Sequence, residues 1–466
     1  MGMTEIWLWL GTGVEYLMAI FAVTAAIFFF IAIISKKRSH LFGFLSGISA
    51  IGMFLCLVLG TTGNILHGLP KRAYMGTFQV TLSIIFITSA VVFIYFAYDA
   101  KNTVGDKDSF YSTFLMAIVT LVMGIYMIVP SLIVFFGAQD ISTIAGLIPY
   151  YTLTFPFPIA RVIMVVVPLI IFAIGIYVLK EMKSKKYLSE HIQEEVKLEK
   201  TYSRLDLEIS RKIYHVLIIV VIIGYLFVGR VIFRAIYNFT FNNLPQPPEM
   251  PLPDQIMTGI IEPYILNFRA GHLLFLMAGS WIFLILLFTD IIRIKKYRYY
   301  PIKTIAKLYR DKERFVLAPH VYLTTGVLFA LMLSDAIASY LGDPTISAHI
   351  VTMTLIVSAI ADAIATIIGI TKGKHHLKGG KSKKTWEGWI AGVVSAFILG
   401  FLSYIILMTL PEYGGNIGQA IVLSLVVTAV FGFIDYFSPP IPISDNLLNP
   451  IAISLALWGV ALIFFI

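Results

Sequence analysis

The chain has 466 residues, of which 58% are apolar and only 13% are charged. A soluble domain carries about a quarter charged residues, and a water-soluble fold of this length could not bury so much apolar surface, so the composition excludes an ordinary soluble protein. The net charge of +9 does not indicate a nucleic-acid partner, because the basic residues fall between apolar runs, where they would meet lipid headgroups. The single cysteine, Cys56, excludes a disulfide framework and a cysteine-built metal site.

Apolar segments of about 20 residues, the length that crosses a bilayer, recur along the chain. They predict an all-α, polytopic transmembrane helical protein with about 12 spans. In chain order the predicted spans are 14–34, 41–61, 78–99, 110–136, 157–179, 214–237, 271–292, 320–340, 346–370, 387–410, 419–437 and 448–466. Basic residues 36–38 after the first span are typical of a stop-transfer flank and not of a cleaved signal peptide.

The lysine and arginine residues divide unequally between the two sides of this topology. One set of alternate loops holds 29 of them and the opposite set holds 5. The positive-inside rule therefore places the first set, which includes 371–386 and 438–447, in the cytoplasm, with both termini outside. We expect a multi-pass protein of a prokaryotic cell membrane, or of the endoplasmic reticulum membrane in a eukaryote.

One charged stretch divides the chain. Residues 181–210 mix both charge signs, which is typical of a solvated cytoplasmic helix. We interpret them as a linker between an N-terminal five-span region, 1–180, and a C-terminal seven-span domain, 211–466. The first 200 residues show no catalytic constellation, so we expect the N-terminal region to be accessory.

The strongest chemical signal surrounds Asp362, an acid about two helical turns before the cytoplasmic end of its predicted span. A charge at that depth is expensive and marks a functional candidate. The loop that follows carries six lysines and several glycines, and it ends at Glu387. Backbone N–H groups, cations and a carboxylate-held Mg²⁺ are what a phosphate-binding site requires. The alternative is a basic loop that binds anionic lipid.

Other polar residues are predicted at the same membrane surface. Asp445 and Asn446 precede the last span and offer oxygen ligands, although a helix cap also explains them. Asp435 ends the span before them. Arg211, Lys212 and His215 precede the sixth span, where flanking charges and a buried histidine are the plain alternative.

The order of these motifs resembles the CTP-dependent polyisoprenol kinase family, which includes dolichol kinase, the phytol and farnesol kinases and CTP-dependent diacylglycerol kinase. The resemblance covers about residues 205–466. Its motifs are Arg211-Lys212-x-x-His215, Asp362-x-x-Ala365-x-x-x-Gly369-x-x-x-Gly373-Lys374, Lys384-Thr385-x-Glu387-Gly388 and Asp445-Asn446. The resemblance implies a kinase that transfers the γ-phosphate of CTP to a long-chain isoprenoid alcohol, with Mg²⁺ as the cofactor.

The resemblance also implies roles for individual residues. Asp362 would bind Mg²⁺ or activate the hydroxyl, and Asp445 would complete the metal site. Catalytic roles fall to Asp362, Lys384, Glu387 and His215. Nucleotide or phosphate binding falls to Arg211, Lys212, Gly369, Gly373, Lys374, Thr385, Gly388 and Asn446.

Two departures and two rival functions accompany this interpretation. Family members often carry a glutamate before the Asp-Asn pair, where this chain has Asp435, and Lys381 and Lys383 crowd Lys384. A CTP-using phospholipid cytidylyltransferase is one rival, but its Lys-Arg-x₄-Lys-Asp run is absent. A transporter is the other, suggested by the span count and by a short echo of the Asp362 motif that begins at Asp335.

Overall fold

The computed structural model describes residues 72–136, 204–229, 263–295, 316–341, 345–377, 384–437 and 443–464, together with residues 24, 231 and 300. The predicted spans 41–61 and 157–179 lie outside these residues, and so does the span 14–34 except for residue 24. So do Cys56 and most of the predicted linker 181–210.

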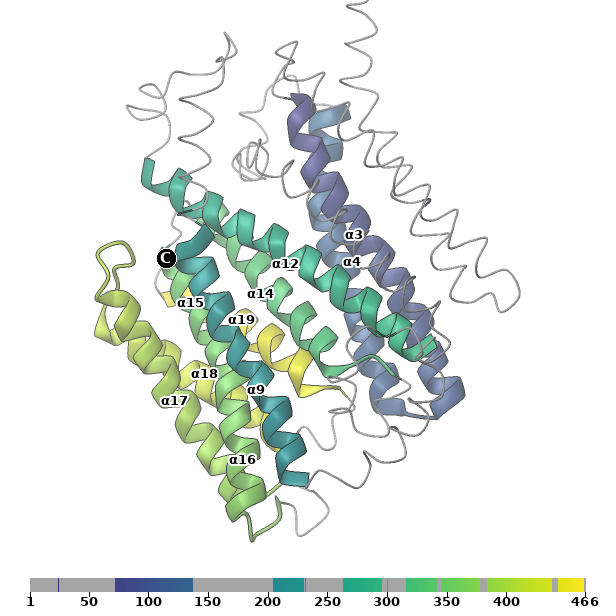
Figure 1. Ribbon diagram of the computed structural model, residues 1–466. Coiled ribbons are helices and arrows are strands. Elements are labelled where there is room, and N and C mark those ends of the chain that lie inside the picture. Colours follow the sequence, from purple (N-terminus) through teal and green to yellow (C-terminus); the bar gives the residue numbers. More distant parts are fainter. Residues whose placement is uncertain are drawn as a thin grey trace, which may run out of the picture. The chain divides into compact units, whose positions relative to one another are not determined.

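Every regular element within the described residues is a helix. They are α3 (Arg72–Asp99), η1 (Ala100–Val104), α4 (Lys107–Phe136), α9 (Arg204–Ile223), η2 (Gly224–Val228), α12 (Pro263–Lys295), α14 (Pro319–Leu341), α15 (Thr345–Ile356), η6 (Val357–Ala361), α16 (Asp362–Lys372), α17 (Trp386–Met408), α18 (Ile417–Phe437) and α19 (Asp445–Phe464), where η marks a π-helical turn (Figure 1).

Five stretches of the described helices are long and apolar enough to cross a membrane. They are Lys107–Met127, Thr345–Lys372, Trp386–Met408, Ile417–Phe437 and Asp445–Phe464. For this part of the chain the expectation of an all-α membrane protein is confirmed. The total of about 12 spans stays a prediction.

The chain divides into two compact units, and the described residues 94–116, 204–226 and those from 285 onward form one of them. The centre of this unit is the continuous helix made of α15, η6 and α16. All residues from 346 to 355 are buried, so α15 is covered on every side. Helices α14, α17 and α19 pack against α15, while α9 and α17 pack against α16 (Figure 1).

Helix α17 shows why this unit suits lipid better than water. Its buried face carries small residues four apart, namely Gly388, Gly392, Ala396 and Gly400. Its exposed face carries large apolar residues at the same spacing, namely Ile390, Val394, Ile398, Leu402 and Ile406. Small residues let membrane helices approach closely, and the apolar outer stripe is a surface that lipid covers.

The other unit contains the described residues 72–93, 117–136 and 263–284. Helices α3 and α4 approach closely at Gly124, because an added Cβ there would lie 2.6 Å from Ile87 Cγ1. The Ser83 hydroxyl donates to the Gly124 carbonyl at 2.9 Å. Phe283 of α12 contacts the rings of Phe86 and Phe93, with centroids 6.5 and 6.0 Å away.

Candidate functional site

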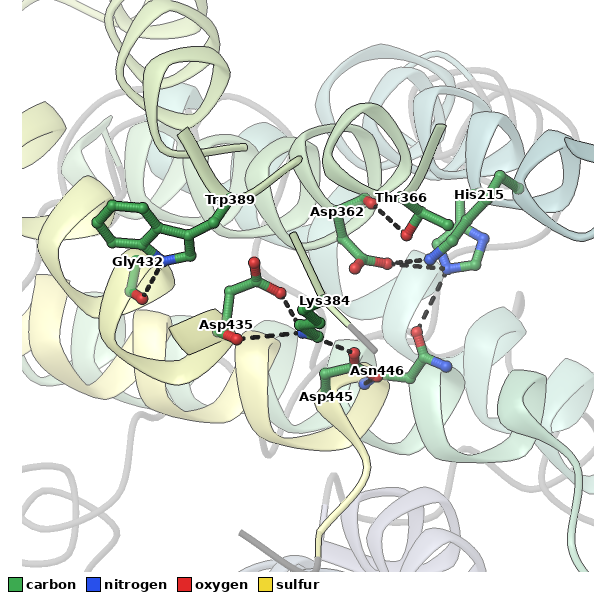
Figure 2. A network of polar contacts seen from close by, with 10 residues as sticks. His215, Asp362, Thr366, Lys384, Trp389, Gly432, Asp435, Asp445 and Asn446 are labelled. Atoms are coloured by element: carbon green, nitrogen blue, oxygen red, sulfur yellow. Dashed lines mark hydrogen bonds and ion pairs between the residues drawn. The ribbon is translucent and has the colours of Figure 1, made fainter. Parts of the chain in front are cut away.

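Three carboxylates from three helices meet in the compact unit that contains the described residues from 285 onward. Asp362 is the first residue of α16, Asp435 lies in the last turn of α18, and Asp445 is the first residue of α19. One oxygen from each lies within 4.8 Å of the others. Figure 2 shows the three side chains together with Lys384. Asp362 and Asp435 are buried, while the Asp445 side chain keeps 30% of its exposure.

Helix α9 brings a lysine and a histidine to Asp362. The Lys212 ammonium forms an ion pair with Asp362 Oδ2. One turn further along, His215 Nε2 lies 3.9 Å from the same oxygen and 3.3 Å from Asn446 Oδ1. The side chain of Arg211 lies outside the described residues. Lys212 and His215, predicted from the sequence, therefore join Asp362 and Asn446 in one network.

Lys384 connects the other two acids. Its ammonium donates to Asp435 Oδ1, donates to the Asp435 carbonyl at 3.2 Å, and lies 3.9 Å from Asp445 Oδ2. Burial alone would lower the pKa of Lys384, but the charge of Asp435, followed by that of Asp445, outweighs burial and raises the pKa above its usual value. The Lys384 ammonium is therefore charged at neutral pH.

A π-helical turn immediately precedes the central acid. Residues 357–361 form η6, and Asp362 begins α16 directly after it. A π-turn changes the register between the helical segments on either side, and such turns are frequent at functional sites. The Thr366 hydroxyl donates to the Asp362 carbonyl at 2.9 Å, within the first turn of α16.

The glycines of the predicted phosphate-binding motif lie where α16 packs against α17. A Cβ added at Gly388 would lie 2.7 Å from the Ala365 carbonyl oxygen and 2.8 Å from Gly369 Cα. A Cβ at Gly373 would collide with the Gly369 carbonyl and with Thr385, and one at Gly369 would lie 3.2 Å from Thr385 Oγ1. Close helix packing accounts for all three glycines, and phosphate binding by them stays a prediction.

The lysine-rich loop is held at its base by backbone contacts. His376 and Thr385 form an antiparallel bridge, Leu377 N donates to the Lys384 carbonyl at 2.9 Å, and Trp386 N donates to the His375 carbonyl at 2.8 Å. Thr385 caps α17 by accepting a hydrogen bond from Gly388 N at 3.3 Å. These contacts fix the backbone from which Lys384 reaches the acids. Residues 378–383 lie outside the described part.

Two predicted residues lie apart from the three acids. The Glu387 carboxylate accepts hydrogen bonds from His375 Nδ1 at 2.7 Å and from His375 N at 3.3 Å. Lys374 is exposed beyond the end of α16. The acid to which Lys384 donates is Asp435, the position at which the sequence departs from the pattern that it otherwise resembles. A metal-binding or lysine-orienting role for Glu387 stays a prediction.

Aromatic side chains mark the level of the site along the helices. Trp386 and Trp389 of α17 contact Tyr436 of α18, with ring centroids 6.1 and 5.9 Å apart. Trp389 Nε1 also donates to the Gly432 carbonyl at 2.9 Å (Figure 2). Tryptophan and tyrosine are enriched where membrane meets water. Tyr436 follows Asp435 in sequence, so this aromatic group lies next to one of the three acids.

Sequence reasoning missed one group of residues near the site. Ser112, in α4, accepts a hydrogen bond from Ser444 N at 2.7 Å, directly before Asp445. The available signal was a series of hydroxyl residues three or four apart at the start of the α4 span.

Comparison with known proteins does not extend this description. No protein-family model matches the chain, and neither a curated protein nor a solved structure matches it.

Proposed function

We propose that this protein is a membrane kinase that transfers the γ-phosphoryl group of CTP to the hydroxyl of a long-chain isoprenoid alcohol, a dolichol or polyprenol. The observation that carries the proposal is the convergence of Lys212, His215, Asp362, Lys384, Asp445 and Asn446, which belong to separate motifs and meet in one network. The resemblance of those motifs to the polyisoprenol kinase family supplies the reaction and the nucleotide.

The donor set suits a magnesium ion. Mg²⁺ prefers carboxylate oxygens, and Asp362, Asp435 and Asp445 supply three within 4.8 Å of one another. Asp362 and Asp445 would hold the ion, with Asp435 as the additional acid in reach. A bound ion would neutralise charge on the phosphate oxygens.

The lysines and the histidine supply the remaining chemistry. Phosphoryl transfer depends mainly on positioning and charge stabilisation. Lys212 and Lys384 would bind phosphate oxygens, since each is held beside the acids by an ion pair. His215, fixed through Asn446, would contact the nucleotide or the developing charge. As the alcohol oxygen bonds to the γ-phosphorus, the bond to the β-phosphate oxygen breaks and CDP leaves with that electron pair.

The hydroxyl proton goes to a nearby base. Asp362 would accept it if Asp435 and Asp445 hold the ion. If Asp362 is itself a ligand of the ion, the ring of His215, 3.9 Å from Asp362 Oδ2, would accept the proton. Asp362 Oδ2 pairs with the Lys212 ammonium and lies 3.9 Å from His215 Nε2, which suits either proton transfer or metal binding. The products are CDP and a polyprenyl monophosphate.

The membrane setting follows from the same proposal. The tail of the alcohol would stay in lipid while its hydroxyl reaches the acids at headgroup depth, beside Trp386, Trp389 and Tyr436. We place the site on the cytoplasmic side of a protein with about 12 spans, in a prokaryotic cell membrane or the endoplasmic reticulum membrane. The basic loop 371–386 supports that side.

The test uses the full chain in lipid vesicles or detergent, incubated with γ-labelled CTP or ATP. Polyprenol, phytol and diacylglycerol are offered separately as acceptors. The proposal expects label in polyprenol, with CTP as the better donor. Label released as pyrophosphate would instead indicate a cytidylyltransferase. No transfer to any acceptor would overturn the kinase proposal and favour a transporter.

A further inference from the structure

The first turns of α4 belong to the same compact unit as the three acids, although they come from the N-terminal part of the chain. Residues three or four apart form their buried face. Ser109, Ser112, Thr113 and Met116 are each at most 9% exposed. The helix start is itself fixed, because Asp106 accepts hydrogen bonds from Asp108 N at 3.2 Å and from the Ser109 hydroxyl at 2.7 Å.

Two contacts hold this face against α14. The Thr113 and Tyr322 hydroxyls are 2.9 Å apart and share a hydrogen bond. The Thr325 hydroxyl lies 3.4 Å from Met116 Sδ, and its hydrogen is shared with the Val321 carbonyl of its own helix at 2.9 Å. Hydroxyls that pair across helices are a common way to fix one membrane helix against another.

A third contact reaches the beginning of α19. The Ser444 carbonyl accepts the first helical hydrogen bonds, from Leu447 N at 3.1 Å and Leu448 N at 3.0 Å. The N–H of such a residue lies outside the hydrogen-bond ladder of its own helix and needs another acceptor. Ser112 Oγ provides that acceptor at 2.7 Å. The start of α19 is thereby tied to a residue 332 positions earlier in the chain.

The two residues after Ser444 both reach the site. Asp445 Oδ2 lies 3.9 Å from the Lys384 ammonium, and Asn446 Oδ1 lies 3.3 Å from His215 Nε2. Asp445 Oδ1 also accepts from Asn446 N at 3.0 Å, so the pair forms one local unit. A small rotation at Ser444 would change the direction of both side chains.

We propose that Ser112 is a positioning residue of this site, and that the first turns of α4 form the element that fixes the Asp445–Asn446 pair. The inference rests on the proposed function for its phosphoryl-transfer readout, and on the metal site of that proposal for its Mn²⁺ readout. It assigns the N-terminal part of the chain a share in building the site, where the sequence indicated an accessory region.

The experiment measures Mn²⁺ affinity by electron paramagnetic resonance on the purified full chain in lipid nanodiscs, with phosphoryl transfer measured in parallel. Ser112→Ala removes the acceptor, and we expect Mn²⁺ to bind about 3- to 10-fold more weakly, the worth of one hydrogen bond. Ser112→Thr retains a hydroxyl and should restore the affinity. Ser403→Ala is the matched control, because the Ser403 hydroxyl is buried but donates within its own helix, to Gly400 at 2.8 Å.

A second variant keeps the inference testable if Ser112→Ala does not fold. Tyr322→Phe removes one oxygen from the α4–α14 contact and should weaken Mn²⁺ binding in the same direction by a smaller factor. Unchanged affinity in Ser112→Ala and Tyr322→Phe would overturn the inference, even if the wild-type chain transfers phosphate. Weaker binding in both, in a chain that transfers no phosphate, would support the inference while removing the proposed function.

Discussion

Two groups of charged residues lie in the same compact unit and differ in how far solvent reaches their side chains. In the first, Asp290 and Arg293 stand on one helix, and their side chains are at most 1% exposed. Asp290 Oδ1 accepts from Arg293 Nε at 2.5 Å, and Asp290 Oδ2 accepts from Ala318 N at 2.8 Å. Arg293 Nη2 donates to the Val316 carbonyl at 2.6 Å. Asp290 and Arg293 pair with each other, and their bonds to Ala318 and Val316 fix the segment that enters α14.

The second group is the candidate site, where solvent still reaches part of the charged side chains. Among the described residues of the site, three carboxylates lie beside two ammonium groups and His215. The side chains of Lys384 and Asp445 retain 28% and 30% of their exposure. Burial of a charge therefore does not by itself indicate function. A group of carboxylates and ammonium ions that solvent can reach is the better indication, because its carboxylates can bind a cation and its ammonium groups can bind phosphates.

The largest effect expected from this comparison is loss of transfer in Asp362→Asn. Removing a metal ligand or catalytic acid commonly costs about 10²-fold or more in rate. The variant should still fold, because asparagine keeps the shape and can accept a hydrogen bond from Lys212. Transfer of label from CTP to polyprenol is the measurement.

The control for that prediction is Asp335→Asn, at the other copy of the short sequence echo. We expect its rate to change by less than about threefold, the size of an ordinary side effect on packing. If Asp335 proved essential and Asp362 dispensable, the site would belong to the other copy.

The second effect concerns stability and tests the buried Asp290–Arg293 pair, referred to below as the closed pair. Arg293→Met leaves Asp290 as a buried unpaired charge, which commonly costs about 3–5 kcal/mol. The double variant Asp290→Leu/Arg293→Met removes both charges and should recover much of that loss. Thermal unfolding in nanodiscs is the measurement. A single variant as stable as the wild-type chain would show that the pair contributes little.

Much of the site could be predicted because its residues stand toward one end of the predicted spans. Lys384 and Asp445 lie in or beside loops that the charge asymmetry assigns to one side, Lys212 precedes a predicted span there, and Asp362 lies about two helical turns from the same side. Sidedness and spacing were sufficient to bring them to one surface. The sequence alone did not predict which of these side chains form ion pairs with one another.

Two features depended on tertiary geometry. Glu387 is close to Lys384 in sequence, yet its carboxylate turns back to the amide and ring of His375, while Asp435 of another helix contacts Lys384. Ser112 contacts Ser444 across 332 residues, and a distance of that kind leaves no local pattern. The sequence also could not decide why Gly369, Gly373 and Gly388 are glycines, because close backbone packing and phosphate binding both favour glycine.

The smallest expected effect concerns pH: the transfer rate of the wild-type chain, relative to that of Lys384→Arg, should not change with pH. The pKa of Lys384 is raised, because attraction to Asp435 and Asp445 outweighs the opposing effect of burial. A raised pKa keeps the ammonium charged below the ordinary lysine value of about 10.4, and the charge is lost only as pH rises through the higher folded value. Lys384→Arg carries a charge that does not titrate, so it serves as the reference.

The transfer rate of the wild-type chain divided by that of Lys384→Arg should therefore stay constant between about pH 7 and 10. Other groups that titrate in this range affect both proteins equally and cancel in the ratio. A closed pair such as Asp290–Arg293 would give the same constancy because solvent does not reach it, whereas Lys384 keeps its charge while partly exposed. A ratio that falls steadily above about pH 8 would show that Lys384 loses its proton early, and that the neighbouring acids do not hold it in the charged form.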